Sequence, residues 1–348
     1  MQEVAAAVGL SEGRRGVRAV LAALARLEPV STRRLSRAVD LPVPIVASIC
    51  GELRKRGVVS DVRPTQLTRL GRALFAAGAL DLQRSATCPK CAGRGVVVRG
   101  EMSALLAEMH EIARAAPPPR LDLDQCHCTA ETKLRRVLAL HDADALVGRR
   151  VLLLGDDDLV SLAIDRVVRR FGSHASIARL AVVDVDPEVV DAARRALGEA
   201  PYPTSYVLHD LREPLPAELR RSFDTVVTDP PYTLEAAVLF LSRAVDALDG
   251  GGDVFFSFGS RRPGAGLLVQ RAIGQMGFAI VRLLRDFNEY VGAGALGGAS
   301  SLYHLSATSG LRPLVAGAFH GPLYTSETGG CVTGRDARSA RRPLPARR

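Results

Sequence analysis

From about residue 148 onward, the chain alternates short apolar runs with amphipathic runs, and this alternation restricts the possible folds most strongly. The apolar runs have the length of strands and lie at 149–155, 178–184, 204–210, 223–228, 253–258 and 278–287. The runs between them repeat apolar residues at helical spacing and lie at 159–171, 187–197, 234–248 and 266–277. Strands that alternate with helices form a parallel sheet covered on both faces. We therefore predict an α/β fold, a Rossmann-like doubly wound sheet, over residues 148–310.

The first part of the chain predicts a separate small domain over residues 1–80. Apolar residues at helical spacing near 17–27 predict one helix, and Ser31 or Thr32 can cap a second that runs through Val39. The stretch 41–59 predicts a third helix ending near Gly57, and a wing and a closing helix follow. This order resembles a winged-helix domain. Such a domain either binds DNA through its third helix or serves as a scaffold or dimerisation module.

Four cysteines between the two domains suggest a metal site. The chain has six cysteines, and the cytosol that we expect for it disfavours structural disulfides. Cys88 and Cys91 form a Cys-x-x-Cys turn, and Cys126 and Cys128 form a second close pair. Four thiolates can hold a structural zinc ion, with His110 or His127 in place of one of them. We therefore expect residues 81–147 to be a linker that either binds zinc or carries reduced cysteines.

Composition excludes a membrane protein and weakens an argument from net charge. The chain is 47% apolar but has no apolar run near 18 residues, and its first residues lack the order of a signal peptide. We expect a cytoplasmic protein. The net charge is +9, but the last 14 residues, RDARSARRPLPARR, contribute six Arg and one Asp. The C-terminal extension, 311–348, thus ends in a basic tail that is either solvated or contacts nucleic acid or an acidic partner.

Acidic residues follow several of the predicted strands. Parallel sheets bind ligands beyond the carboxyl ends of their strands. Asp184 follows the second strand, where a carboxylate can bind both hydroxyls of a ribose, and Asp210 follows the third, where it can accept from an adenine amino group. These positions are typical of S-adenosylmethionine-type transferases. A surface carboxylate at a strand end is the alternative for each residue alone.

The stretch DPPY, Asp229 to Tyr232, follows the fourth strand and suits a nitrogen nucleophile. Pro230 and Pro231 fix the backbone as it leaves the strand, so the Asp229 carboxylate and the Tyr232 ring are held around one point. The carboxylate accepts protons from a nitrogen, and the ring can face a cation. We expect Asp229, Pro230 and Tyr232 to surround an amine or amide substrate.

The stretch LLLGDDDLVS places three adjacent aspartates, Asp156 to Asp158, where ordinary methyltransferases carry glycines. They would repel the carboxylate of S-adenosylmethionine, since two unit charges about 6 Å apart cost about 3 kcal/mol at a dielectric near 20. The cluster therefore calls for cations. Decarboxylated S-adenosylmethionine as co-substrate and a polyamine as substrate would supply them. A Mg²⁺ site or a solvated acidic turn is the alternative.

Several motifs in this order resemble the branched-chain polyamine synthase family, the N4-bis(aminopropyl)spermidine synthases. The shared features are the winged-helix N-terminus and the stretches CPKCAGRG, TAET, LLLGDDDLVS, VVDVD, HDLREPLP, FDTVVTDPPYTL and RDFNEY. The resemblance implies transfer of the aminopropyl group of decarboxylated S-adenosylmethionine to the secondary amine of spermidine, carried out twice. The implied products are a quaternary branched polyamine and 5′-methylthioadenosine.

This reaction needs an unprotonated amine, because attack beside the sulfonium is an in-line displacement. We expect Asp158 to be the base that takes the proton of the amine, with Asp229 and Tyr232 orienting it. Gly155 would allow the adenosyl part to approach closely, beside Asp184 and Asp210.

The cationic ends of the substrates need acidic partners of their own. We expect Asp156, on the donor side, and Asp157, on the acceptor side, to hold such ends. Asp286, Glu289 and Tyr290 of the RDFNEY stretch are candidates for the remote ammonium groups of the polyamine.

Two other functions remain open at the level of sequence. DPPY also occurs in N-methyltransferases that act on amines or on nucleobase nitrogens, and these must extrude a base into the site. A winged-helix regulator with a sensing domain for a small molecule is the non-enzymatic alternative. A homodimer formed through the N-terminal domain is compatible with all three.

Overall fold

The structure is a computed structural model that describes residues 1–76, 88, 90–91, 93–172, 176–260, 262–292 and 298–327. Cys331, most of the Gly-rich loop before residue 298 and the Arg-rich tail lie outside the described residues. The chain divides into two compact units, Met1–Cys88 with Gly292–Ala299 and Pro89–Val291 with Ser300–Arg348.

The N-terminal unit is helical around a small apolar core. Its helices are α1 (Gln2–Ala7), α2 (Gly13–Leu27), α3 (Thr32–Val39), α4 (Val43–Lys55) and α5 (Arg69–Ala76). The Ser31 hydroxyl accepts a hydrogen bond from the backbone N–H of Arg34 and so caps α3, as the sequence predicted. An antiparallel bridge between Val30 and Thr65 ties the segment after α4 to the residues just before α3, and a second bridge, Val59 with Leu67, lies within that segment.

The larger unit contains the predicted sheet and its helices. Its helical elements are η1 (Gly100–Ala104), α6 (Leu105–Ala115), η2 (Leu121–Leu123), α7 (Ala130–Asp142), α8 (Val160–Phe171), α9 (Pro187–Leu197), η3 (Ala217–Leu219), α10 (Leu234–Ala247) and α11 (Pro263–Gln275). Its strands are β1 (Arg150–Leu154), β2 (Arg179–Asp184), β3 (Thr204–Leu208), β4 (Phe223–Thr228), β5 (Leu248–Phe258), β6 (Phe278–Glu289) and β7 (Ala299–Ala307).

The sheet is Rossmann-like but mixed rather than wholly parallel. Its order is β3-β2-β1-β4-β5-β7-β6. The pairs among β1 to β5 are parallel, whereas β7 pairs antiparallel with β5. Strand β7 was not among the predicted strands. Tyr303, Leu305 and Ala307 recur at a spacing of two and pack in the core on one face of the sheet, but this apolar pattern is short and follows several glycines.

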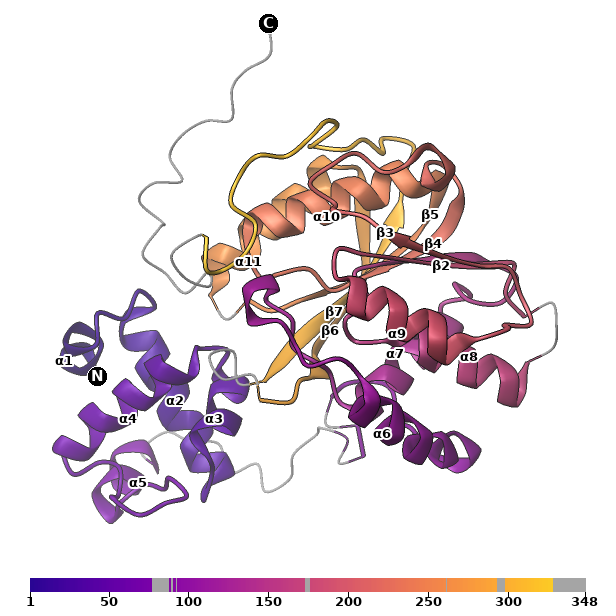
Figure 1. Ribbon diagram of the computed structural model, residues 1–348. Coiled ribbons are helices and arrows are strands. Elements are labelled where there is room, and N and C mark those ends of the chain that lie inside the picture. The colour runs from indigo at the N-terminus through magenta and orange to yellow at the C-terminus, as the bar shows by residue number, and fades with distance from the viewer. Residues whose placement is uncertain are drawn as a thin grey trace, which may run out of the picture. The chain divides into compact units, whose positions relative to one another are not determined.

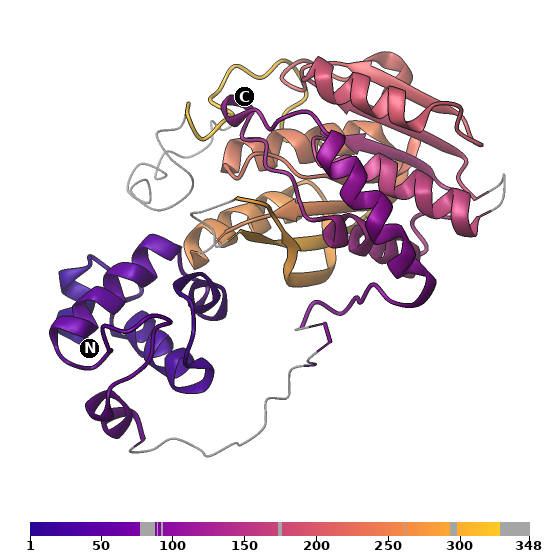
Figure 2. The same ribbon diagram turned by 60° about the horizontal axis from the view of Figure 1, so that its bottom comes forward.

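Two apolar layers cover the sheet because successive strand residues point to opposite faces. Leu152 and Leu154 of β1 pack with α10 and α11 on one face, and Val151 and Leu153 pack with α6 to α9 on the other. Figure 1 shows these helical layers on either side of the strands, and the rotated view in Figure 2 shows the same arrangement.

The segment between residues 93 and 147, which the sequence analysis described as a linker, packs onto the sheet. Leu134, Val137 and Leu140 of α7 are buried in the same apolar layer as the strands. Helix α7 was not predicted from the sequence. It also buries three cations, Lys133, Arg135 and Arg136, so its role is not limited to apolar packing.

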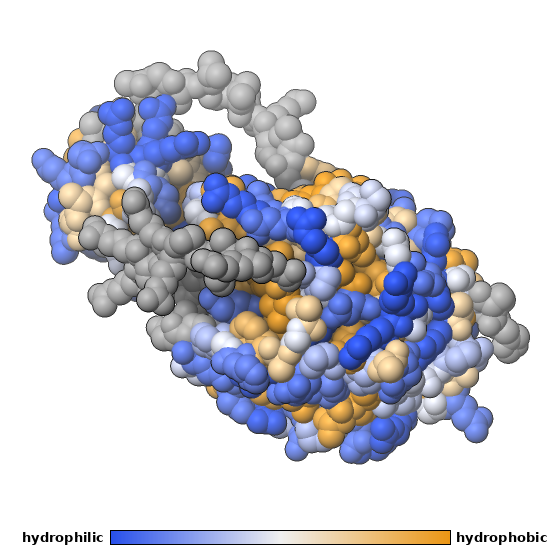
Figure 3. All heavy atoms as spheres, turned by 90° about the horizontal axis from the view of Figure 1, so that it is seen from above, coloured by the Kyte–Doolittle hydropathy of each residue, from blue (hydrophilic) through white to orange (hydrophobic). Residues whose placement is uncertain are grey.

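The surface of the molecule mixes charged and apolar side chains. Figure 3 shows apolar patches between hydrophilic side chains on the face seen from above. Among the helices of the described residues, we find none with the length and apolar character that a bilayer crossing requires.

Candidate active site

The turn after β1 orders the three adjacent aspartates. Gly155 has a φ of +76°, a conformation that favours glycine, and it turns the chain toward α8. The Asp156 carboxylate accepts hydrogen bonds from the backbone N–H of Val160 at 2.7 Å and from the Ser161 hydroxyl. Asp156 therefore caps the N-terminus of α8, and its side chain is engaged there rather than with a ligand.

Burial makes Asp156 an unusual carboxyl group. Its residue is only 1% exposed, and this burial raises its pKa to about 7, although the hydrogen bonds from Ser161 oppose the rise. The expectation that Asp156 holds a cationic substrate end is corrected, because its oxygens point at the helix terminus.

Asp158 lies in a buried ion-pair network with α7. Its Oδ2 is 2.7 Å from Nη1 of Arg136, and its Oδ1 accepts from the backbone N–H of Cys128. The Lys133 ammonium donates to the Asp158 carbonyl oxygen. Burial opposes ionisation of Asp158, but the charges of Arg136 and Lys133 outweigh it, so the pKa of Asp158 lies below its usual value.

Asp229, which follows β4, accepts hydrogen bonds from three side chains. Arg136 Nη2 and the Tyr290 hydroxyl each lie 2.6 Å from its Oδ2, and the Tyr232 hydroxyl lies 3.1 Å from its Oδ1. The two tyrosine hydroxyls are 2.7 Å apart. Burial raises the pKa of Asp229 to about 6, while Arg136 opposes the rise. DPPY and RDFNEY, far apart in the sequence, thus meet at one carboxylate.

A cavity opens at the carboxyl ends of the strands next to these groups. Its interior volume is about 60 Å³, and it opens to solvent. Its acidic lining consists of Asp124, Asp157, Asp184, Asp210 and Asp229, and its apolar lining includes Val185, Leu211, Phe240, Leu323 and Tyr324. Gly155 and Pro231 also line it. The cavity combines acidic groups with a wall that suits a planar ring.

Asp184 and Asp210 lie where the sequence predicted them, after β2 and β3. Asp184 is buried, and its carboxylate accepts from the backbone N–H groups of Asp156 and Asp186, each at 2.8 Å. Burial raises the pKa of Asp184 despite these hydrogen bonds. Asp210 accepts from the backbone N–H of Arg212 at 2.9 Å. Both carboxylates therefore face the cavity from fixed backbone positions.

Asp157 differs from its two neighbours because it lines the cavity without an ion-pair partner among the described residues. Its carboxylate accepts a hydrogen bond from the backbone N–H of Cys126 at 3.3 Å, the one such bond among the described residues. Burial raises its pKa well above the usual value, and the negative charges of Asp158, Asp229 and Asp184 raise it further. Of the triple aspartate, Asp157 is thus the carboxylate available to a ligand.

The buried cations only partly neutralise this cluster. Asp156, Asp157, Asp158, Asp184 and Asp229 are five carboxylates, whereas Lys133 and Arg136 are two cations. When all are ionised, the negative charges remain in excess. The raised pKa values of Asp156, Asp157, Asp184 and Asp229 mean that protons also neutralise part of this charge, so the preference for cationic ligands stays a prediction.

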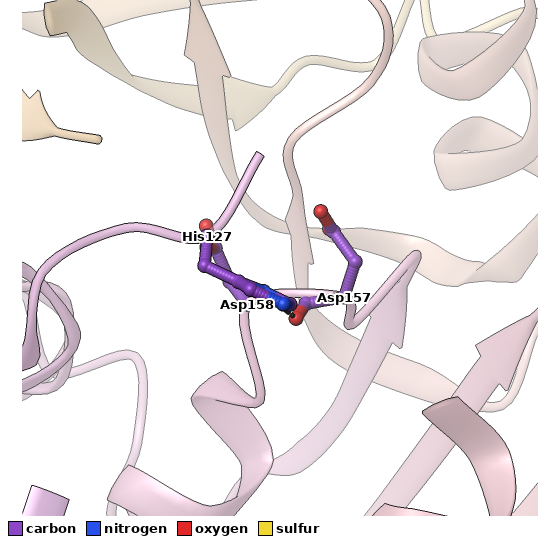
Figure 4. A group of neighbouring side chains, drawn as sticks. All are labelled: His127, Asp157 and Asp158. Atoms are coloured by element: carbon purple, nitrogen blue, oxygen red, sulfur yellow. Dashed lines mark hydrogen bonds between the residues drawn. The ribbon is translucent and has the colours of Figure 1, made fainter. Parts of the chain in front are cut away.

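The described residues contain one group of possible metal-ligand atoms within 4.8 Å of one another, namely His127, Asp157 and Asp158. Figure 4 shows these side chains, with Asp157 standing apart from the other two. The ring nitrogens of His127 lie 2.9 Å and 2.8 Å from the carbonyl oxygens of Asp157 and Pro117. Asp158 is paired with Arg136. These partners already engage His127 and Asp158, whereas the Asp157 carboxylate has no ion-pair partner among the described residues.

The predicted zinc site stays a prediction. Within the larger unit, the described residues Cys91, Cys126 and Cys128 form no ligand group of that kind, and Cys88 belongs to the other unit. The Cys128 thiol is buried beside Lys133, and burial raises its pKa well above the ordinary value.

Comparison with known proteins identifies the family. The sequence profile described as "Branched-chain polyamine synthase A C-terminal domain" matches residues 104–302. The N(4)-bis(aminopropyl)spermidine synthase of Thermococcus kodakarensis is 34% identical over 268 residues, which cover 74% of each chain. The chain belongs to the branched-chain polyamine synthase family. The enzyme of the same name from Methanocaldococcus jannaschii is 30% identical over 274 residues, 76% of each chain.

A crystal structure from this family has the same overall architecture. It is the branched-chain polyamine synthase from Thermus thermophilus in complex with N4-aminopropylspermidine and 5′-methylthioadenosine. The match has a TM-score of 0.72 at 26% identity and covers 93% of this chain and 96% of that one. The chain described here therefore has the Rossmann-like fold of methyltransferase type that this synthase has.

Some residues predicted from the polyamine synthase resemblance lie away from the cavity lining. Glu289 pairs with Arg94 at 2.8 Å and with Arg135 at 3.5 Å, so it already has two cationic partners. The backbone carbonyl of Asp286 accepts from Arg94, and Asp286 is not part of the cavity lining. Pro230 is buried, and its neighbour Pro231 faces the cavity instead. Tyr290, by contrast, lies at the centre of the Asp229 cluster.

Sequence reasoning missed the residues that complete this site. Lys133 and Arg136 follow the TAET stretch, and the charged run KLRR in an otherwise apolar helix was a usable signal, since buried cations need partners. Leu323 and Tyr324 reach the cavity from the segment after β7. No local pattern in the sequence marks that segment as part of the site.

Proposed function

We propose that this branched-chain polyamine synthase transfers the aminopropyl group of decarboxylated S-adenosylmethionine to the secondary amine of a polyamine such as spermidine. The observation that carries the proposal is the cavity at the strand ends, which keeps an excess of carboxylates beside an apolar wall. A donor that ends in an ammonium group and a polycationic acceptor match this charge. A donor with a carboxylate would meet repulsion from Asp157 and Asp229.

The nucleoside of the donor fits the part of the cavity near Asp184 and Asp210. In the proposed complex, Asp184 accepts from the ribose hydroxyls, as acidic residues after the second strand do in such folds. Phe240 and Tyr324 provide the apolar wall for the base, and Gly155 lets the ligand approach the backbone. This arrangement directs the sulfonium toward Asp157 and Asp229.

We assign the role of base to Asp157 rather than to Asp158. The secondary amine must lose its proton, and a carboxylate with a raised pKa accepts a proton near neutral pH more readily than one with a lowered pKa. Asp157 has the raised pKa and free acceptor capacity, whereas Asp158 is tied to Arg136. Asp229 and Tyr232 orient the nitrogen.

In the first transfer, the amine nitrogen attacks the methylene carbon next to the sulfonium. The new C–N bond forms as the C–S bond breaks, the sulfur leaves as the neutral thioether 5′-methylthioadenosine, and the amine proton passes to Asp157. The product is a tertiary amine. A second transfer starts from the unprotonated tertiary amine, releases no proton at the bond-forming step and gives a quaternary ammonium.

The test is a comparison of two donors with purified protein and spermidine, with products identified by mass spectrometry. We expect 5′-methylthioadenosine and aminopropylated spermidine only with decarboxylated S-adenosylmethionine. Formation of S-adenosylhomocysteine and a methylated amine with S-adenosylmethionine would instead make the protein an N-methyltransferase. Absence of any product with tight polyamine binding would favour a sensing role.

For the N-terminal unit, we infer a winged-helix module. Three consecutive helices, α2 to α4, precede a segment joined by the bridge between Val59 and Leu67, which supports this assignment. None of the cavity-lining residues belongs to this unit.

A further inference from the structure

We propose that Arg136 is a positioning residue that decides which carboxylate at the strand ends accepts the proton of the amine. It does so by binding Asp158 and Asp229 and leaving Asp157 unpaired. This inference rests on the proposed aminopropyl transfer and adds a residue that the sequence analysis did not consider.

The guanidinium of Arg136 donates four hydrogen bonds. Its Nη1 donates to Asp158 at 2.7 Å, its Nη2 to Asp229 at 2.6 Å and to the Tyr290 hydroxyl at 3.1 Å, and its Nε to the Asn288 side chain at 2.8 Å. The residue is 1% exposed. A planar fork of donors holds two carboxylates in fixed directions, which an ammonium group cannot do as well.

The position of Arg136 separates the roles of the acidic residues. Asp158 and Asp229 come from different strand ends, after β1 and β4, and their like charges would repel each other without a shared cation. Arg136 contacts both but makes no ion pair with Asp157, which lines the cavity. The cation therefore fixes Asp229 for substrate orientation and keeps Asp158 ionised and occupied.

Arg135, the preceding residue on α7, provides a matched control. It is also 1% exposed, and it donates to Thr132 at 2.7 Å and to the Phe287 carbonyl at 2.9 Å. It contacts neither Asp158 nor Asp229. Truncating either arginine removes a buried guanidinium from the same helix, but only Arg136 touches the carboxylate cluster.

The test compares Arg136→Ala with Arg135→Ala in the full chain, using release of 5′-methylthioadenosine as the assay. We expect Arg136→Ala to lower kcat about 100-fold, the size of effect that misplacing a reacting group by about 1 Å produces. The KM for the donor should stay near the wild-type value, because Asp184 and Gly155 do not contact Arg136. Added guanidinium chloride at millimolar concentration should restore part of the kcat of Arg136→Ala, and an equal concentration of tetramethylammonium should not.

Arg136→Lys is the second variant, should Arg136→Ala fail to fold. The lysine keeps the positive charge but lacks the planar set of donors that binds two carboxylates. Its kcat should therefore fall between those of wild type and Arg136→Ala. Equal losses of kcat in Arg135→Ala and Arg136→Ala, or wild-type kcat in Arg136→Lys, would overturn the inference. A wild-type protein that releases no 5′-methylthioadenosine would instead defeat the proposed function, and the inference with it.

Discussion

At the scale of the residue, three adjacent aspartates have three different environments. Asp156 caps a helix, Asp157 lines the cavity, and Asp158 pairs with buried cations. Their side chains diverge because the turn after Gly155 rotates each residue relative to the last. Three identical residues therefore have different roles. We expect exchange for asparagine to change activity at one of them and stability at another.

Asp157→Asn should abolish proton acceptance while keeping the size of the side chain. We expect kcat to fall by at least about 100-fold, within the range that general bases contribute. Binding of the nucleoside product should change little, because Asp184 and the apolar wall are intact. Steady-state kinetics and calorimetric titration with 5′-methylthioadenosine measure the two quantities.

Asp158→Asn should act on stability rather than on the chemical step alone. It leaves the Arg136 and Lys133 charges buried with less compensation, and breaking a buried ion pair by removing one partner costs about 3–5 kcal/mol. Urea denaturation gives the free energy of unfolding. If Asp158→Asn were as stable as wild type but inactive, while Asp157→Asn kept its activity, Asp158 would be the base after all.

At the scale of the element, the N-terminus of α8 depends on a buried carboxyl group. The Asp156 carboxylate accepts hydrogen bonds there from the Ser161 hydroxyl and from the backbone N–H of Val160. An ionised carboxylate suits the positive end of a helix dipole. Burial outweighs this benefit, since the pKa of Asp156 rises from 3.8 to about 7. The helix cap is therefore sensitive to pH.

The direction in which pH changes the stability follows from the pKa of Asp156 in the folded chain and in the unfolded chain. Asp156 binds its proton more tightly in the folded chain, so its contribution to stability is full below pH 3.8 and is lost as pH rises through about 7. Asp156→Asn cannot ionise and keeps an acceptor for the helix. Between pH 5 and pH 8, its stability relative to wild type should rise by about 2 kcal/mol.

Urea denaturation of both proteins at the two pH values measures this change. Ser161→Ala is the control, because loss of its hydroxyl leaves the Asp156 carboxylate with fewer donors and should lower stability more at pH 8 than at pH 5. A difference between wild type and Asp156→Asn that did not vary with pH would contradict the assignment of the raised pKa to Asp156.

At the scale of the whole molecule, local charge and net charge have opposite signs. The chain carries a net charge of +9, whereas the cavity has an excess of carboxylates. A field set by the net charge would repel a polyamine, and a field set by the cavity would attract it. Field lines in a cleft with low-dielectric walls are focused, so we expect the local field to govern binding.

Varying the salt concentration distinguishes the field of the cavity from the field of the net charge. If the cavity governs binding, raising NaCl from 50 to 300 mM should lower kcat/KM for spermidine several-fold, since the Debye length shortens from about 14 to about 6 Å. The effect on the less highly charged donor should be smaller. Initial rates at each salt concentration provide the measurement. A rise of kcat/KM for spermidine with salt would show that the net positive charge dominates.

Much of the fold was determined by the sequence alone, because hydrophobic periodicity is a local property of the chain. The alternation of strands and helices from β1 to β6 and the acidic residues at the strand ends could be predicted. Strand β7 and helix α7 could not be predicted. Glycines precede the short apolar pattern of β7, and the buried cations of α7 interrupt its apolar pattern.

Local sequence also identified which residues bear the chemistry, through GDDD, DPPY and RDFNEY, but not what each residue does. Whether Asp157 or Asp158 is free depends on Arg136, which comes from a helix more than 20 positions earlier. Which buried charges form pairs depends on which helices and strands lie next to each other. The sequence does not give the distances between charged groups on different elements. The tertiary structure alone therefore assigned the partners, and with them the base.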